Sequence, residues 1–227
     1  MKTTSDTTLQ PTYHLDCEAD EVQQFVDRAL PSRDLPRREM AVRLHDAVRD
    51  KLRYEVYDAD LSREGTTASA IIRRGQGFCV HKSIVYAAAC RAVGVPTRLL
   101  YGDVRNHLTS KKLLNLMGSD IFTFHALVSV NLNDRWVRAT PVFNTLLCRL
   151  YGIRPLEFDG ENDSYYHPFD VAGHRHMEFI RWRGEFDDFP YEIVVGGIFA
   201  NHPNLAGNGL KTLSGSLVED AQREEKR

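Results

Sequence analysis

The chain has 227 residues, of which 42% are hydrophobic and 26% charged, and its formal net charge is −2. This composition is typical of a globular protein that buries a full core. The small net charge gives no basic field for nucleic acid or an anionic membrane surface. No apolar run approaches the length of about 18 residues that a membrane span requires. The polar N-terminus lacks the apolar core of a signal peptide, so we expect a cytoplasmic protein.

The two ends of the chain are more polar than the rest, and the last ten residues are mostly charged. We expect an N-terminal tail over residues 1–18, a single domain over residues 19–215 and a charged tail over residues 216–227. Residues 1–8 and 216–227 are expected to be frayed, because polar termini have little apolar surface to bury.

Three helical patterns precede the first informative motif. Apolar residues recur at helical spacing over residues 19–30 and again over residues 38–52. Residues 68–73 are consistent with a short helix or a turn. That segment leads into a loop rich in glycine.

The most informative residue of the sequence is Cys79. It follows the glycine-rich run of residues 75–78 and opens an apolar helical run that extends to Val93 and stops at Gly94. A cysteine at a helix N-terminus lies where the helix dipole favours a thiolate, so we predict a pKa below the ordinary value of about 8.5. The backbone N–H of Cys79 is the first candidate donor to an oxyanion, and the Gln76 side chain is the second.

The other three cysteines carry no chemical signal. None of the four forms a Cys-x-x-Cys pair, so the spacing of a zinc site is absent. Cys90 lies on the same apolar run as Cys79, and Cys148 follows two leucines, so both are predicted to be buried and inert. Cys17 gives no indication of its role.

The middle of the chain predicts strands. Residues 97–104 alternate and are rich in β-formers, and residues 106–120 are a loop or a short helix. Residues 125–132 and 135–140 form a predicted hairpin with a turn at Asn133-Asp134. His125 stands at the head of this hairpin, about 46 residues after Cys79, where it is a plausible general base for a thiol.

The predicted turn also fixes which residues share a face of the hairpin. It pairs Leu132 with Arg135 and Leu127 with Thr140. Thr140 is then a diagonal neighbour of His125 on the same face, with the two backbones about 7–8 Å apart. A general-base histidine needs an acceptor that holds its second ring N–H, and a threonine hydroxyl can serve.

The C-terminal third is harder to interpret. Residues 146–151 and 175–183 are predicted helices, and residues 159–174 a long loop. Several histidines and carboxylates gather here, so a metal site is one interpretation and a self-satisfying polar loop the other. The spacing fits no zinc motif, which favours the loop and no metal. The residues concerned are His167, His174, His176, Asp163, Asp170 and Glu178.

Four separated stretches together resemble the transglutaminase-like superfamily. They are Gly-Gln-Gly-Phe-Cys at 75–79, Cys-Arg-Ala-Val-Gly-Val-Pro-Thr-Arg at 90–98, Phe-His-Ala-Leu-Val at 124–128 and Trp-Val-Arg-Ala-Thr-Pro at 136–141. The resemblance covers roughly residues 40–144 and leaves residues 145–215 as a C-terminal extension. It implies a papain-like α+β fold, in which the nucleophile helix packs on an antiparallel sheet.

The resemblance also implies roles for particular residues. Cys79 matches the family's nucleophile and His125 its base, whereas Thr140 stands where the family has aspartate. Either Thr140 serves as a neutral orienting group, or another residue takes its place, or the domain has lost catalysis. Asn144, Asp159 and Asp170 are the nearby substitutes in the sequence.

The function expected from the sequence is cysteine-dependent acyl chemistry on an amide or peptide, through a thioester and without a cofactor. Hydrolysis is favoured over transfer to an amine, because no amine acceptor site is evident. The alternative is a catalytically degenerate binding or scaffold domain. The substrate and the oligomeric state stay open.

Overall fold

The protein is described from a computed structural model, which covers residues 6–107, 111–166, 171–174, 176–205 and 209–225. It is an α+β fold, as the sequence predicts, with one antiparallel four-stranded sheet in the order β5-β4-β3-β6. A separate pair of two-residue strands, β1 and β2, lies parallel. The strands are β1 (Arg53–Tyr54), β2 (Gln76–Gly77), β3 (Thr97–Asn106), β4 (Ile121–Leu132), β5 (Arg135–Ala139) and β6 (Met177–Phe186).

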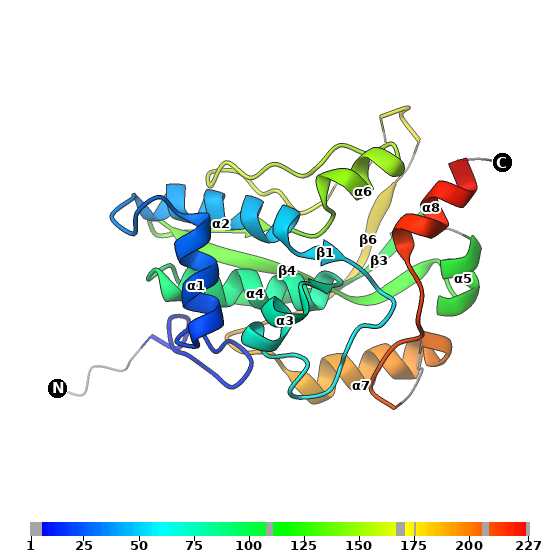
Figure 1. Cartoon of the computed structure of the whole chain (residues 1–227), viewed down its shortest axis with the longest axis horizontal. Helices are drawn as coiled ribbons and strands as arrows, with labels where there is room; N and C mark the ends of the chain where they lie inside the picture. The colour runs from blue at the N-terminus through cyan, green and yellow to red at the C-terminus, as the bar shows by residue number, and fades with distance from the viewer. Residues whose placement is uncertain (1–5, 108–110, 167–170, 175, 206–208, 226–227) are drawn as a thin grey trace.

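The helices predicted before residue 95 are all present, within one or two residues of their expected ends. Figure 1 shows helix α4, which begins at Cys79, running along the sheet, with α1, α2 and α3 beside it and α7 below. The helices are α1 (Asp20–Ala29), α2 (Arg37–Lys51), α3 (Ala68–Arg74), α4 (Cys79–Ala92), α5 (Lys111–Met117), α6 (Thr145–Leu150), α7 (Tyr191–Asn201) and α8 (Leu217–Glu225), with a 3-10 turn, η1 (Pro203–Leu205).

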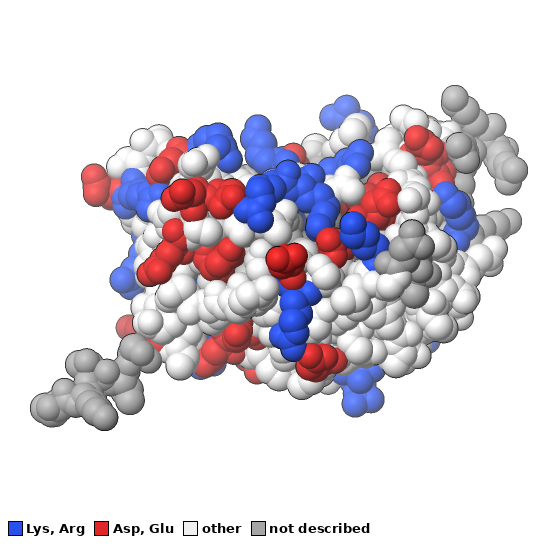
Figure 2. Space-filling model, turned by 60° about the horizontal axis from the view of Figure 1, so that its bottom comes forward, with Lys and Arg blue, Asp and Glu red and all other residues white. Residues whose placement is uncertain are grey.

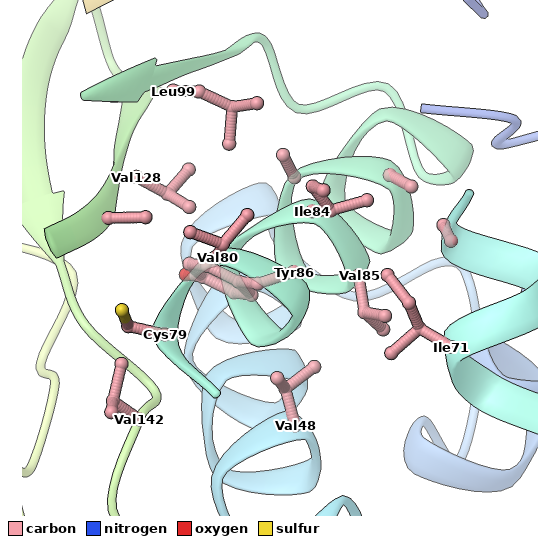
Figure 3. Close-up of a cluster of buried hydrophobic side chains, with 14 of the residues drawn as sticks. Val48, Ile71, Cys79, Val80, Ile84, Val85, Tyr86, Leu99, Val128 and Val142 are labelled. Carbon is pink, nitrogen blue, oxygen red and sulfur yellow. The ribbon is translucent and has the colours of Figure 1, made fainter. Parts of the chain in front are cut away.

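Helix α4 lies at the centre of the hydrophobic core. All thirteen of its residues from Cys79 to Arg91 are buried, and the amino group of the buried Lys82 donates to the carbonyls of Arg49 and Leu52. Figure 3 shows Val80 with Leu99 and Val128 on the side of the sheet, and Val85 with Ile71 on the side of α3. Packing on all sides fixes the helix, and therefore the position of Cys79 at its first turn.

The hairpin of β4 and β5 forms in the predicted register. Leu132 pairs with Arg135 and Val128 with Ala139. Asn133 and Asp134 both have positive φ, at 53° and 61°, which is the geometry of the two-residue turn that hairpins favour. Local turn chemistry therefore sets the face on which each residue of this hairpin lies.

The helix predicted over residues 175–183 is wrong. Met177–Phe186 is the edge strand β6, which pairs antiparallel with β3, for example Leu99 with Phe186. The segment is rich in aromatic and β-branched residues, but no helical or alternating pattern reveals its partner, which lies about 80 residues away. Long-range pairing decided its structure.

The expectation of frayed ends is also wrong where the structure describes those residues. Thr8 is buried, and Leu15 and Cys17, further along the N-terminal tail, are buried against the core with 0% and 4% of their surface exposed. At the other end, Leu217 and Ala221 of α8 are buried at 2% and 4%. The division of the chain into one domain and two tails stays a prediction.

The surface carries both charge signs. On the face that Figure 2 shows, Lys and Arg are interspersed with Asp and Glu, without a field of one sign. Of the helices in the described part of the chain, none is long and apolar enough to cross a membrane.

Candidate active site

The backbone before Cys79 is shaped by two glycines. Gly75 ends α3 with φ 70°, a conformation that glycine adopts without strain. At Gly77 a Cβ atom would lie 2.4 Å from the Cβ of His81, so only glycine allows this strand to approach the first turn of α4. The chain thus enters the helix with Cys79 as its first residue.

The sulfur of Cys79 lies among backbone N–H groups. Those of Ala126, Val80 and Cys79 itself form hydrogen bonds that lower the pKa of the thiol. Two of them belong to the helix N-terminus, as the sequence predicts, and the third comes from β4. Ala126 directly follows His125, so this bond ties the thiol to the strand that bears the candidate base.

Burial nevertheless outweighs these hydrogen bonds. The Cys79 side chain is 0% exposed, and desolvation raises its pKa to about 12, opposite to the lowered value predicted from the helix N-terminus. Burial also lowers the pKa of His125 to about 4. At neutral pH the two groups are therefore a neutral thiol and a neutral imidazole, and not a thiolate–imidazolium pair.

This protonation state predicts the pH dependence of thiol reactivity. We expect the alkylation rate of Cys79 by iodoacetamide to rise about tenfold per pH unit from pH 7 to 10, because the thiolate fraction grows in that proportion below the pKa. Rates measured by peptide mass spectrometry, with Cys79→Ala as the blank, test this expectation. A plateau below pH 8.5 would contradict it and would indicate a pre-formed ion pair.

His125 sits where the pairing of β3 and β4 is irregular. The ladder shifts between Gly102 and Val104, and His125 pairs with Gly102. The preceding residue, Phe124, has φ 57°, and its N–H donates to Asp103 Oδ1 at 3.3 Å. Arg183 Nε donates to the same carboxylate, at 2.9 Å from Oδ1. These contacts fix the backbone on either side of the imidazole.

The imidazole of His125 lines two cavities. The first, of about 60 Å³, is enclosed mostly by apolar side chains together with Tyr54. The second, of about 10 Å³, also has Thr140 and Arg154 in its wall. The ring of Phe179 on β6 packs edge-on against the imidazole, with 6.1 Å between centroids.

Thr140 therefore lies beside His125, but no hydrogen bond joins them. Continuing the observed register past Ala139 places Thr140 opposite Leu127, as predicted. The Thr140 N–H donates to Ser164 O at 3.0 Å. Within the described residues, neither Thr140 Oγ1 nor His125 Nε2 has a hydrogen-bond partner. The role of Thr140 in orienting the ring stays a prediction.

The Cys79 thiol and the His125 imidazole lie on opposite faces of β4, although Ala126, which contacts the thiol, directly follows His125 in the chain. Ala126 belongs to the core that contains α4, and consecutive side chains of a strand point to opposite faces. His125 accordingly faces the cavities, whereas Cys79 is not among the described residues that line them. Transfer of the thiol proton to His125 thus requires rearrangement. Catalytic hydrogen bonds often tighten only when substrate binds.

The substitutes for Thr140 that the structure describes are engaged elsewhere. Asn144 accepts from Tyr54 N–H and donates to the backbone carbonyls of Arg49 and Leu52, which end α2. Asp159 accepts from the backbone N–H groups of residues 161 and 162 in its own loop. Asp170 lies outside the described residues.

Gln76 is placed away from the imidazole. Its side-chain oxygen accepts a hydrogen bond from Arg53, and it lines neither cavity at His125. Its assignment as an oxyanion donor stays a prediction, and the geometry gives more weight to the backbone N–H groups around Cys79.

Two further cysteines are buried, and the histidine-rich region of the sequence does not form a metal site in the described residues. Cys90 and Cys148 are buried, as predicted, at 0% and 1% exposure, and burial raises the pKa of each to about 12. No three residues of the described part are grouped so that they could hold a metal ion. His167 of the predicted cluster lies outside that part. Asp163 instead accepts from the backbone N–H of Arg138.

The sequence indicates no role for two buried tyrosines, Tyr54 and Tyr101. Burial, more than any other cause, raises the pKa of both phenols well above the usual value. Tyr101 pairs with Ala126 across the sheet, and its buried hydroxyl has no partner among the described residues. Only the pairing of β3 with β4 brings Tyr101 next to Ala126.

Comparison with known proteins identifies the family. No curated protein matches the chain. A solved protein from Cytophaga hutchinsonii, described as a "putative cysteine protease", shares 17% identity with a TM-score of 0.43. The alignment covers 59% of this chain and 40% of that one, so this chain spans less than half of its length. The sequence model of the transglutaminase-like superfamily matches residues 24–141, just over half of the chain, and the chain belongs to that superfamily.

Proposed function

We propose that the protein performs cysteine-dependent acyl chemistry on an amide or peptide, with Cys79 as nucleophile and His125 as general base. Membership of the superfamily supports cysteine chemistry in general. The observation that carries the proposal is the set of three backbone N–H groups around the Cys79 sulfur. Such donors stabilise negative charge on the sulfur, and on a carbonyl oxygen bound beside it.

The reaction proceeds from a neutral pair. As the sulfur forms a bond to the carbonyl carbon, the thiol proton passes to His125. The carbon–nitrogen bond then breaks, the same proton goes to the leaving amine, and a thioester remains on Cys79. Water attacks the thioester, gives one proton to His125, and releases a carboxylic acid while the thiol is restored.

Hydrolysis is proposed ahead of transfer to an amine. Transfer requires a second site that holds an amine nucleophile next to the thioester. The cavity at His125 is lined mostly by apolar side chains and contains no carboxylate among its described residues. The described wall therefore offers no negative charge to bind the ammonium group of an amine acceptor. A water molecule can attack the thioester without a dedicated binding site.

A degenerate binding or scaffold domain is the second candidate. Three observations favour it: Cys79 is fully buried, Thr140 stands where the family has aspartate, and the thiol and imidazole are neutral. A scaffold needs the fold but no proton transfer, so the two candidates differ in whether His125 assists the thiol.

A carbonyl-directed thiol probe separates them. We expect a peptidyl acyloxymethyl ketone to label Cys79, and His125→Gln to slow labelling about 100-fold or more, because general-base assistance is worth that much. Cys79→Ala is the blank. Iodoacetamide at pH 10, where the thiolate forms without help from the imidazole, is the control for access, and its rate there should be unchanged in His125→Gln.

Mass spectrometry of the labelled peptide gives both rates. Equal probe rates in the wild type and in His125→Gln would contradict the proposal and favour the scaffold, as would the absence of any labelling. Thermal melts of both proteins show that the comparison concerns folded molecules.

A further inference from the structure

The larger cavity at His125 is built from parts of the chain that are far apart in sequence. Val104 comes from β3 and Phe122 from β4, both beside the irregular pairing that positions His125. Leu147 of α6, in the C-terminal extension, and Leu217 of α8, in the charged tail, close it on another side. Tyr54, from the strand β1 that pairs with β2 just before Cys79, is part of the same wall. The cavity therefore lies directly beside the imidazole of His125.

The size of the cavity limits what it can hold. Its volume is about 60 Å³. A single water needs about 10–15 Å³ on the same measure, so the space corresponds to roughly four to six heavy atoms. The side chains of leucine and methionine have four heavy atoms, whereas that of tryptophan has ten and does not fit.

The chemistry of the wall limits it further. Apart from His125, the polar side chains in it are few, and Asn106, Tyr151 and His176 already make interactions of their own. A carboxamide has two N–H donors and a carbonyl acceptor. If His125 Nε2 and the Tyr54 hydroxyl pair with some of these groups, the rest stay without partners when buried here, which is costly. An aliphatic or thioether side chain has no such groups and gains by leaving water.

We propose that this cavity binds the side chain of the acyl-donor residue, and that it selects an unbranched or γ-branched aliphatic side chain such as methionine or leucine over the carboxamide of glutamine. The inference rests on the proposed function, because it gives the substrate class of the same site. Methionine and glutamine side chains are similar in length and shape, so the comparison isolates polarity.

The experiment uses acyloxymethyl ketone probes that differ only in the side chain next to the ketone: glycine, methionine, leucine, glutamine and tryptophan. Labelling rates at Cys79 are measured by peptide mass spectrometry. We expect the methionine probe to react about 10- to 100-fold faster than the glutamine probe, the range set by burying an unpaired amide. The tryptophan probe should be slower than the glycine probe.

A pair of matched variants tests whether this cavity is responsible. Val104→Thr adds a hydroxyl to its wall at nearly constant volume and should narrow the methionine-to-glutamine ratio. Val130→Thr makes the same change on β4, away from the cavity, and should leave the ratio as in the wild type. If either variant does not fold, the wild-type ratio alone decides.

Each outcome has a distinct meaning. A ratio near one, or faster labelling by the glutamine probe, overturns the cavity proposal and leaves the proposed function standing. A ratio that does not change in folded Val104→Thr also counts against this cavity. If no probe labels Cys79, including the glycine probe, the proposed function fails and this inference fails with it.

Discussion

Thr140→Asp should raise the pKa of His125 and speed alkylation of Cys79 by iodoacetamide at pH 7. Burial lowers the pKa of His125 to about 4, and among the described residues no charged group offsets that burial. A carboxylate within reach of an imidazole typically raises its pKa by about 1–3 units. A more basic imidazole accepts the thiol proton more readily, so more of the thiolate is present.

The position of residue 140 makes this substitution specific. The hydrogen bond from its N–H to Ser164 O fixes the backbone, and its side chain lines the smaller cavity with His125. Arg154 lines the same cavity, so a carboxylate at 140 also has a guanidinium nearby that favours its ionised form. The matched control is Thr140→Asn, which has the shape of the aspartate without its charge.

Two measurements check the prediction. An NMR titration of His125 gives its pKa in the wild type and in both variants, and mass spectrometry gives the alkylation rate of Cys79. If a folded Thr140→Asp protein shows neither a raised His125 pKa nor a faster rate than Thr140→Asn, Thr140 does not act on His125. The third group of the site must then be sought in the C-terminal extension.

The parts of this site that the sequence predicts are those determined by neighbouring residues. The glycine run and the apolar stretch after it specify the entry and length of α4, and with them the place of Cys79. The Asn133-Asp134 turn specifies the hairpin register, and with it the face that Thr140 shares with His125. Both depend on contacts a few residues apart in the chain.

What the sequence does not predict depends on distant segments. The fully buried state of Cys79, and hence its raised pKa, follows from packing of the whole domain around the first turn of α4. The pairing of β6 with β3 brings Phe179 to His125, although a helix was predicted for that segment. The charged composition of the last residues concealed a helix that closes a cavity at the site.

The buried carboxylate of Glu55 anchors helix α8. Removing this carboxylate should strongly destabilise the folded protein. Glu55 is 1% exposed, and its Oε1 accepts from the N–H groups of Val56 and Tyr57 at 3.0 and 3.1 Å. Its Oε2 accepts from the N–H of Leu217, the first residue of α8, at 3.1 Å. The side chain therefore links the segment after β1 to the start of α8.

Glu55→Ala leaves three buried N–H groups without an acceptor. Each costs about 1–3 kcal/mol when no water replaces the lost oxygen, and we expect a total loss of about 3 kcal/mol or more. For a chain of this size that corresponds to a fall in melting temperature of about 6–12 °C. A fall of less than about 2 °C would show that the carboxylate is not the anchor.

Glu55→Gln is the matched control, and it should cost much less. Burial raises the pKa of Glu55, so the folded protein disfavours the charge of this side chain relative to the neutral form. A glutamine keeps one side-chain oxygen as an acceptor in nearly the same shape, without that charge. The difference in melting temperature between the two variants therefore measures the contribution of the hydrogen-bond acceptor at position 55, and not that of its negative charge.

The same pair of variants tests whether α8 governs access to the site. Leu217 is part of the cavity wall, so freeing the start of α8 in Glu55→Ala should open the cavity on the side of the charged tail. Hydrogen exchange at residues 217–222 should then be faster than in Glu55→Gln, because exchange follows local opening. Cys79 should also alkylate faster in Glu55→Ala at a temperature where both variants are folded. Faster exchange with an unchanged alkylation rate would show that α8 is anchored by Glu55 but does not cover the route to the thiol.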